Sequence, residues 1–376
     1  MAEFNLDPGA EADRGLRVAW DARYLRRRDV GISAYLAAGI LQGLNRGWKT
    51  HLLTDDPGHA GDLERDFPDA SVSVVRARTK SIWEQSAVAR HLRVNRYDVF
   101  ISPANTGLPL LFRGQTRLIL IVHDLIPLRY PRRYLLPRPV WASSYVFGLA
   151  ASLLRADGIL CVSRATRADV LRLGRRRGVH LAFPNIAPQR QSDQALPNPA
   201  VSARRYFVYS GGYDWRKNVP ALLAGFAMLL RRTQNDYSLV VLGNRPRWFD
   251  ELVSKMGLSE HVIGTGYVGD ALRDEITAGA VGLVYTSRYE GYGLPVLEGL
   301  MLGVPVVCGS GGSLLEVGGD VVIRVDPCIP RSICEGMIKA IAGVTEHAQV
   351  EIDRHLQALM VEREQHSLAR AVIASM

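Results

Sequence analysis

The sequence has few cysteines, and their spacing matches no common metal site. Cys161, Cys308, Cys328 and Cys334 form no C-x-x-C pair, so neither a zinc motif nor a disulfide framework is indicated. The simplest expectation is a reduced, cytoplasmic chain. No acidic pair of the D-x-D kind follows a predicted strand. We therefore expect no bound metal and no cofactor.

A long apolar run is also missing. The longest uncharged stretch, "PVWASSYVFGLAASLL" (139–154), is shorter than the ~20 residues that a membrane-spanning helix needs. It is predicted to be a core or interfacial helix, with core as the favoured alternative. The first residues, "MAEFNLDPGAEADRG", are polar and acidic, which predicts a flexible tail over 1–15 and not a signal peptide.

Positive charge is concentrated in the first half of the chain. The formal net charge is +9, and arginine runs occur at 26–28, 132–133 and 175–177, interleaved with tyrosine and tryptophan. One interpretation, slightly favoured, is a surface that meets anionic lipid headgroups or a phosphorylated acceptor. The other is an ordinary solvated face of an arginine-rich protein.

Strand and helix patterns alternate along all 376 residues, enough chain for two domains. This alternation predicts an α/β protein with parallel, doubly wound sheets. The stretch "APQRQSDQALPNPA" (187–200) is polar and proline-rich, as linkers are. The predicted organisation is a first Rossmann-like domain over 16–187, a linker over 188–202, a second such domain over 203–348 and a C-terminal helix over 349–376. Twelve strands are expected, at 16–22, 49–53, 71–75, 97–102, 117–124, 158–163, 179–184, 205–211, 238–243, 281–287, 304–309 and 321–325.

Two glutamates flank a glycine turn in "RYEGYGLPVLEGLMLGVPVV" (288–307). Pro295 suits the first turn of a helix and Gly303 suits its end, so the pattern predicts strand, turn and short helix. Glu290 then lies on the turn and Glu298 lies early in the helix. Carboxylates accept hydrogen bonds from vicinal hydroxyls, which a sugar or a ribose offers. The segment therefore predicts a sugar or nucleotide site.

A second motif opens the second domain, "YSGGYDWRKNVPALLAGF" (209–226). It predicts a strand, a Gly-Gly turn, and then Arg216 and Lys217 just before Asn218, the expected N-cap of a helix. Two cations beside a helix N-terminus can hold a diphosphate. An exposed basic pair before a helix is the alternative, but the nearby glutamate motif favours the binding site.

With these motifs the chain resembles the glycosyltransferases of family four, which have the two-domain GT-B fold, and within them the bacterial mannosyltransferase-like group of O-antigen and exopolysaccharide biosynthesis. The resemblance extends from "RVAWDARYL" to about residue 345. It includes "GISAY" (31–35), "HDLIPLRYP" (123–131), "CVSRATRADVLR" (161–172), "RKN" (216–218), "YEGYGLPVLEG" (289–299) and "SLLEVGGD" (313–320). It implies two Rossmann-like domains that face a cleft, with the C-terminal helix crossing back to the first domain.

The resemblance also implies roles for individual residues. Lys217 and Arg216 are expected to hold the donor diphosphate as the leaving group, Glu290 to contact sugar hydroxyls, Glu298 to bind the ribose, and His123 to reach the donor sugar from the first domain. Gly31 is expected near the phosphate and the acceptor. The remaining donor-binding positions implied are Gly211, Gly212, Gly291, Tyr292, Gly293 and Leu294.

Two of the motifs depart from the family pattern. Gly212 stands where many relatives carry arginine or threonine, and Ser33 and Ala34 replace the second glycine and the arginine of the loop at 31–35. The first departure places more of the charge on Arg216. The second changes the acceptor side. His123 and Gly31 also have purely structural alternatives, as a strand-end hydrogen-bonding residue and as a turn glycine.

The implied function is a retaining, metal-independent glycosyltransferase that moves a hexose, mannose from GDP-mannose, onto a polyprenyl-diphosphate-linked glycan. The partners would be the nucleotide sugar, the glycan acceptor and an anionic membrane surface on the inner face of the plasma membrane, without nucleic acid. Three alternatives stay open: a sugar-nucleotide epimerase of the same fold, a basic nucleic-acid-binding protein, and a sugar-binding subunit without activity.

Overall fold

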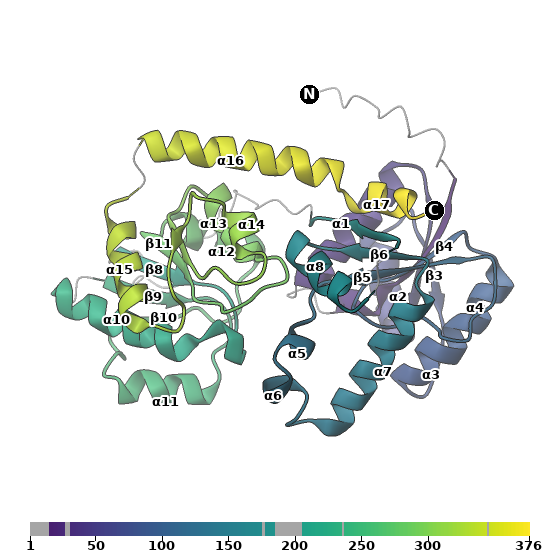
Figure 1. The fold of residues 1–376 in the computed structure, drawn as a ribbon, viewed down its shortest axis with the longest axis horizontal. Coiled ribbons are helices and arrows are strands. Elements are labelled where there is room, and N and C mark those ends of the chain that lie inside the picture. Colours follow the sequence, from purple (N-terminus) through teal and green to yellow (C-terminus); the bar gives the residue numbers. More distant parts are fainter. Residues whose placement is uncertain (1–14, 27–30, 175–176, 185–204, 235–236, 344–345) are drawn as a thin grey trace. The chain divides into compact units, whose positions relative to one another are not determined.

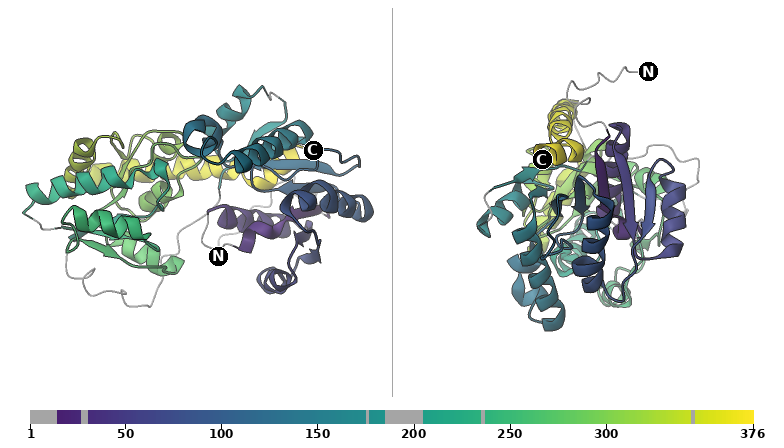
Figure 2. Two further views of the ribbon diagram at one scale, coloured as in Figure 1. Left: turned by 90° about the horizontal axis from the view of Figure 1, so that it is seen from below. Right: turned by 90° about the vertical axis from the view of Figure 1, so that its right-hand side faces the viewer.

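The computed structural model describes residues 15–26, 31–174, 177–184, 205–234, 237–343 and 346–376. Almost all of the predicted tail and the whole predicted linker, 188–202, lie outside these ranges. The chain forms two compact units. Unit 1 comprises Met1–Ile186 and Glu362–Met376, and unit 2 comprises Ala187–Val361. Figures 1 and 2 show the ribbon in three orientations.

Unit 1 is built on a parallel sheet with the strand order β3-β2-β1-β4-β5-β6-β7. Helices lie on both of its faces (Figure 2). The strands are β1 Arg17–Asp21, β2 Lys49–Thr54, β3 Ser71–Val74, β4 Val99–Ser102, β5 Arg117–Val122, β6 Gly158–Cys161 and β7 Val179–Leu181. The helices are η1 Ala22–Arg26, α1 Gly31–Asn45, α2 Pro57–Asp66, α3 Lys80–Ile82, the π-helix η2 Trp83–Ala87, α4 Val88–Asn95, α5 Ile126–Arg129, α6 Pro131–Tyr134, α7 Pro139–Arg155, α8 Arg164–Arg172 and α17 Leu368–Ala374.

Unit 2 repeats this design with the parallel order β10-β9-β8-β11-β12-β13. Its strands are β8 Arg205–Tyr209, β9 Tyr237–Val241, β10 Val262–Gly264, β11 Gly282–Tyr285, β12 Val306–Cys308 and β13 Ile323–Arg324. Its helices are the 3-10 turn η3 Trp215–Lys217, α10 Val219–Arg232, α11 Arg247–Lys255, α12 Asp270–Ala278, α13 Leu294–Met301, α14 Leu314–Gly318 and α15 Pro330–Ile341. The helix α16, Glu346–Gln365, runs from unit 2 into unit 1.

The apolar runs of the strands explain both cores. Parallel strands covered on both faces bury every side chain, and β4, β6, β9 and β11 are buried along their whole length. In unit 2, α10 and α15 pack closely because Gly225 has no side chain. A Cβ there would lie 2.8 Å from the carbonyl oxygen of Pro330. Side chains of both helices belong to the buried core on this side of the sheet.

Both sheets change winding direction at one point. In unit 2 the chain moves outward from β8 to β9 and β10, then returns to add β11 beside β8. Ligands of doubly wound proteins bind outside the carboxyl ends of the strands at such a point. The segments that follow β8 and β11 are therefore the place to look for a site in unit 2.

The structure differs from the sequence prediction in two elements. The strand β10 was not expected, because it has only three residues and ends in glycine. The C-terminal region, expected as one helix over 349–376, contains α16 and α17, which are separated at His366 and Ser367. The carbonyl of His366 accepts from the backbone N–H of Phe183 at 2.9 Å, and α17 then packs against α1, β6 and β7.

Candidate functional site

A buried cluster of charges lies at the switch point of unit 2. Lys217 ends the η3 turn after β8, and Glu290 lies on the loop after β11. Both side chains are almost fully buried, at 6% and 7% exposure. Lys217 Nζ donates to Glu290 Oε1 at 2.6 Å and Arg216 Nη1 donates to the same oxygen at 2.5 Å. The structure thus brings together the two motifs that the sequence singled out.

Two further donors reach this carboxylate oxygen. The Tyr285 hydroxyl donates to Glu290 Oε1 at 2.9 Å, and the Ser287 hydroxyl donates to it at 2.6 Å. Lys217 Nζ also contacts the Tyr285 hydroxyl and lies 4.4 Å from the centre of its ring. Charge-assisted hydrogen bonds of this kind are about twice as strong as neutral ones. They hold the lysine and the glutamate in fixed positions.

The environment shifts the pKa values of this pair in the same direction. Burial lowers the pKa of Lys217 to about 8, although Glu290 opposes the shift. Burial would raise the pKa of Glu290, but the charges of Lys217 and Arg216 outweigh it and hold that pKa below its ordinary value. Two cations then face one carboxylate. A second carboxylate lies at the edge of the cluster, since Asp214 Oδ1 is 3.5 Å from Arg216 Nε.

Glycines allow the loops around the cluster to come close together. A Cβ on Gly211 would lie 2.9 Å from Cε2 of Tyr285, and Gly212 has a φ of +67°, which glycine adopts without strain. Gly293 also has a positive φ, at +99°, and ends the turn just before α13. The backbone of Glu290 pairs with Gly311 and Ser313. Gly291 and Tyr292 are buried between these segments and Leu294 begins α13.

Glu298 has a different environment from Glu290. It lies in the middle of α13, where Arg273 Nη2 is 3.9 Å from its Oε1. Burial raises the pKa of Glu298, and Arg273 only partly opposes this because Asp274 and Asp270 add negative charge. The pKa values of the two glutamates are therefore shifted in opposite directions, although the two residues look alike in the sequence.

Asn218 occupies the N-cap position of α10, but its side chain does not cap that helix. Its backbone is left-handed, with a φ of +50°, and its side-chain amide instead donates to the carbonyl of Pro327. The predicted N-cap position is therefore confirmed, but no side-chain capping hydrogen bond accompanies it. Asparagine tolerates the left-handed conformation better than most residues, so here it shapes the turn that carries Lys217.

In unit 1, His123 follows β5, next to the point where β1 and β4 meet. Its Nε2 is 2.6 Å from the carbonyl oxygen of Pro103, and its backbone carbonyl accepts from the Thr166 hydroxyl at 3.0 Å. Because a carbonyl only accepts, Nε2 carries the hydrogen and Nδ1 is the acceptor of the neutral ring. Burial lowers the pKa of His123 to about 4, so the ring is neutral at physiological pH.

The motif at 31–35, expected as a loop, forms the start of α1 and reaches the same histidine. Tyr35 packs edge-to-face on His123, with ring centroids 5.3 Å apart, and its hydroxyl donates to the carbonyl of Ala182 at 2.9 Å. Ser33, one of the departures from the family pattern, donates its hydroxyl to the carbonyl of Tyr24 at 2.8 Å. Gly31 is the first, exposed residue of α1. Residues 27–30, just before it, lie outside the described chain.

Sequence reasoning missed Tyr285 and Ser287 as parts of the cluster. Tyr285 reads as the last apolar residue of a buried strand, and nothing in its type distinguishes it from a core tyrosine. The available signal was position: both residues belong to the segment between β11 and Glu290, at the carboxyl end of a strand beside the switch point.

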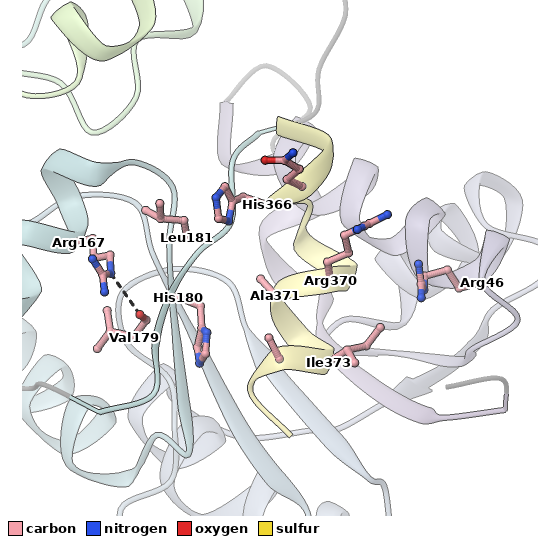
Figure 3. A pocket seen from close by; sticks show the side chains of 11 residues that line it. Arg46, Arg167, Val179, His180, Leu181, His366, Arg370, Ala371 and Ile373 are labelled. Carbon is pink, nitrogen blue, oxygen red and sulfur yellow. Dashed lines mark hydrogen bonds between the residues drawn. The ribbon is translucent and has the colours of Figure 1, made fainter. Parts of the chain in front are cut away.

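A pocket of about 680 Å³ lies elsewhere in unit 1, beside β7 and α17 (Figure 3). Three arginines and two histidines line it and no Asp or Glu does, but none of the predicted site residues belongs to its lining. Arg167 Nε donates to the carbonyl of Val179 at 3.3 Å. Burial lowers the pKa values of His180 and His366. The pocket is therefore separate from the residues predicted to bind the donor.

Two family models match consecutive parts of the chain. The model described as Glycosyltransferase Family 4 matches residues 31–190, and the model described as Glycosyl transferases group 1 matches residues 193–351. Two parallel-sheet Rossmann-like units define the GT-B class of fold. The chain belongs to the glycosyltransferases of family four, and the predicted fold and enzyme class are confirmed.

Among curated relatives, the O-antigen chain mannosyltransferase B of Escherichia coli is 34% identical over 193 residues, which are 48% of this chain and 50% of the relative. The serotype-specific mannosyltransferase WbdA of Escherichia coli is 26% identical over 214 residues, 50% of this chain and 25% of the relative. The match thus spans half or less of each relative's length.

Solved structures share the fold at low identity. Anabaena HepE in complex with UDP and glucose has a TM-score of 0.71 at 14% identity, with 96% of this chain and all of that chain covered. WaaG, a glycosyltransferase involved in lipopolysaccharide biosynthesis, has a TM-score of 0.66 at 16% identity, with 95% and 98% covered. At this level of identity the likeness concerns the fold alone.

Proposed function

We propose that the protein transfers a hexose from a nucleoside-diphosphate sugar to a lipid-linked oligosaccharide, with retention at the anomeric carbon and without a divalent metal. The observation that carries the proposal is the buried cluster of Lys217, Arg216 and Glu290 at the switch point of unit 2. The donor most in keeping with the relatives is GDP-mannose, because those relatives are named as mannosyltransferases.

The chemistry of transfer fits the charges of this cluster. As the bond between the anomeric carbon and the diphosphate breaks, negative charge grows on the leaving oxygens and positive charge grows on the sugar. Lys217 and Arg216 would stabilise the first, and the Glu290 carboxylate would complement the second while binding sugar hydroxyls. Fixed charges in a water-poor site need little reorganisation as the reaction proceeds. Two cations can take the place that a divalent ion has in other transferases.

The remaining predicted residues have proposed roles of the same kind. The neutral ring of His123 offers Nδ1 as a hydrogen-bond acceptor for a sugar hydroxyl. Glu298 would accept from the ribose, and the glycine turns at 211–212 and 291–293 would let a diphosphate and a hexose approach the backbone closely. Because the proposed acceptor is anchored in lipid, the protein would act at the inner face of the plasma membrane.

A thermal-shift panel tests the donor site. Purified full-length protein is heated with GDP, UDP, dTDP and their common sugar conjugates, and the panel is repeated with the Lys217→Ala variant. A ligand at ~100 times its Kd stabilises the folded state by about 2.7 kcal/mol. We expect guanosine diphosphate and its sugar conjugates to raise the Tm of the wild-type protein clearly and to leave the Tm of the variant unchanged. If no nucleotide raises the Tm of the wild-type protein, the nucleotide-sugar proposal is wrong.

The lowered pKa of Lys217 predicts a pH dependence of donor binding. Only the protonated amine attracts the diphosphate, so affinity is expected to be highest below the pKa of about 8 and to fall as the pH rises through it. Lys217→Arg supplies the control, since arginine stays charged at every pH tested. Calorimetric titration of the nucleoside diphosphate from pH 7 to pH 9 measures both. An equal fall in both proteins would assign the titration to another group.

A further inference from the structure

The helix α7 leaves much of its apolar surface uncovered. Val140, Phe147 and Leu154 are 83%, 60% and 75% exposed, and they are spaced seven residues apart. Two helical turns separate each pair, so all three lie on one side of α7. Of the side chains that α7 buries, Leu149 and Ser152 lie away from this stripe, whereas Ala151 lies on the same side as the stripe, between Phe147 and Leu154. The expectation that this stripe belongs to the core is therefore wrong for its greater part.

The exposed stripe continues into the segment before the helix. Leu136, just ahead of α7, is 71% exposed, and Trp141 in the first turn is 43% exposed and stacks on Tyr145. Figure 1 shows the N-terminal half of α7 extending beyond the sheet of unit 1, next to α5 and α6. No described helix is both long and apolar enough to cross a bilayer. Such a stripe fits contact with the surface of a membrane or of another protein.

Charge of one sign surrounds the stripe. Between Leu125 and Ala156 the sequence has arginines at 129, 132, 133, 138 and 155 and no aspartate or glutamate. Arg129 pairs with Asp169, and Arg155 donates to the carbonyl of Phe112. Arg132 and Arg138 are exposed beside the start of α7. The surface is thus both apolar and cationic.

The start of α7 breaks a local rule of helix stability. The helix dipole favours anions at an N-terminus, yet Arg138 occupies the N-cap position, makes no capping hydrogen bond and has no acidic residue after it in the first turn. An anion bound from outside the protein would compensate both the positive end of the helix dipole and the charge of Arg138. Phosphate groups are well suited to the N-terminus of a helix.

We infer that this face, formed by Leu136, Val140, Phe147 and Leu154 with Arg132 and Arg138, docks unit 1 on an anionic phospholipid surface. The apolar side chains enter the boundary between headgroups and acyl chains, and the arginines contact lipid phosphates. The inference deepens the proposed function, since a lipid-linked acceptor is presented at that surface. Docking itself requires neither donor nor acceptor, so the two can fail separately.

A second copy of the chain fits this face less well. A two-fold symmetric contact would place the face against itself and bring Arg132 and Arg138 near the same residues of the partner. With no acidic side chain in this segment, that contact would join like charges and is disfavoured. An anionic lipid surface complements the charge as well as the apolar stripe. This is why we assign the face to lipid.

The experiment is co-sedimentation of the full-length protein with vesicles of phosphatidylcholine alone or mixed with phosphatidylglycerol. We expect binding only to the mixed vesicles. Arg138→Ala should weaken it roughly fivefold, since a basic residue near an anionic surface contributes about 1 kcal/mol. Phe147→Asp should weaken it about tenfold or more, because a charge replaces an aromatic side chain that would insert into the interface.

The matched control is Val94→Asp, which introduces the same charge at a 75% exposed apolar position on α4. It should bind vesicles like the wild type, and all variants should keep the Tm and the nucleotide-induced shift of the wild type. Equal losses for Val94→Asp and Phe147→Asp, or no loss for Phe147→Asp, would overturn the assignment. So would a dimer in solution that Phe147→Asp dissociates while vesicle binding is unchanged.

Discussion

Replacement of Lys217 by alanine is expected to reduce the rate of sugar transfer by about 10² to 10³ while leaving the fold intact, which is the usual cost of removing one preorganised donor from a developing anion. Lys217 Nζ is fixed by Glu290 and Tyr285 in a site with 6% exposure, so no mobile side chain can take its place. Arg216 remains and supplies the residual charge.

The measurement is kcat with saturating nucleotide sugar and a lipid-linked or synthetic acceptor, in the presence of EDTA because the proposal includes metal independence. Lys255→Ala, at an exposed position of α11 in the same unit, is the matched control and should behave as wild type. A Lys217→Ala variant within a few-fold of the wild-type rate would refute the leaving-group role.

Replacement of Glu290 by alanine is expected to destabilise unit 2 by about 3 to 5 kcal/mol, the cost of leaving a buried charge without its partner. The carboxylate accepts hydrogen bonds from Arg216, Lys217 and two hydroxyl groups. Without it, the buried amine of Lys217 loses its carboxylate partner, while Arg216 retains Asp214. The amine of Lys217 should then lose its proton at a lower pH than in the wild type.

Urea unfolding followed by circular dichroism measures the loss for Glu290→Ala. The control is Glu251→Ala, which removes an exposed glutamate that pairs with Arg247 four residues earlier. An exposed helical pair of this kind contributes about 0.3 to 0.5 kcal/mol. If both variants unfold at the same urea concentration, the buried cluster does not stabilise unit 2 in the way that its contacts indicate.

Most strands of both sheets could be predicted because buried parallel strands carry uninterrupted apolar runs. β10 lacks this signal: it consists of Val262–Gly264 and pairs only with β9 at the edge of its sheet. The break between α16 and α17 was missed for another reason. It depends on the backbone contact between Phe183 and His366, two residues far apart in the sequence.

The sequence indicated where the main residues of the cluster lie, but it did not reveal all of the contacts between them. Strand ends and glycine turns indicated where Lys217 and Glu290 would lie, because topology brings the ends of adjacent parallel strands to one edge. That a single oxygen of Glu290 serves four donors could not be predicted, since Tyr285 has the sequence signature of a core residue. The exposure of α7 could not be predicted either, because an apolar run in the sequence looks the same whether its side chains are buried or exposed.

The return of the chain to unit 1 has a consequence for biosynthesis. Unit 1 is assembled from Met1–Ile186 and Glu362–Met376, so the whole of unit 2 is inserted within its sequence. Leu368 of α17 packs where Gly39 of α1 leaves room, with its Cδ1 3.1 Å from the position a Cβ would take. A domain usually folds as soon as it leaves the ribosome. Unit 1, which is translated first, therefore cannot complete its fold until unit 2 and α17 have been translated. Until then the surface of α1 that α17 covers stays exposed and is prone to aggregation.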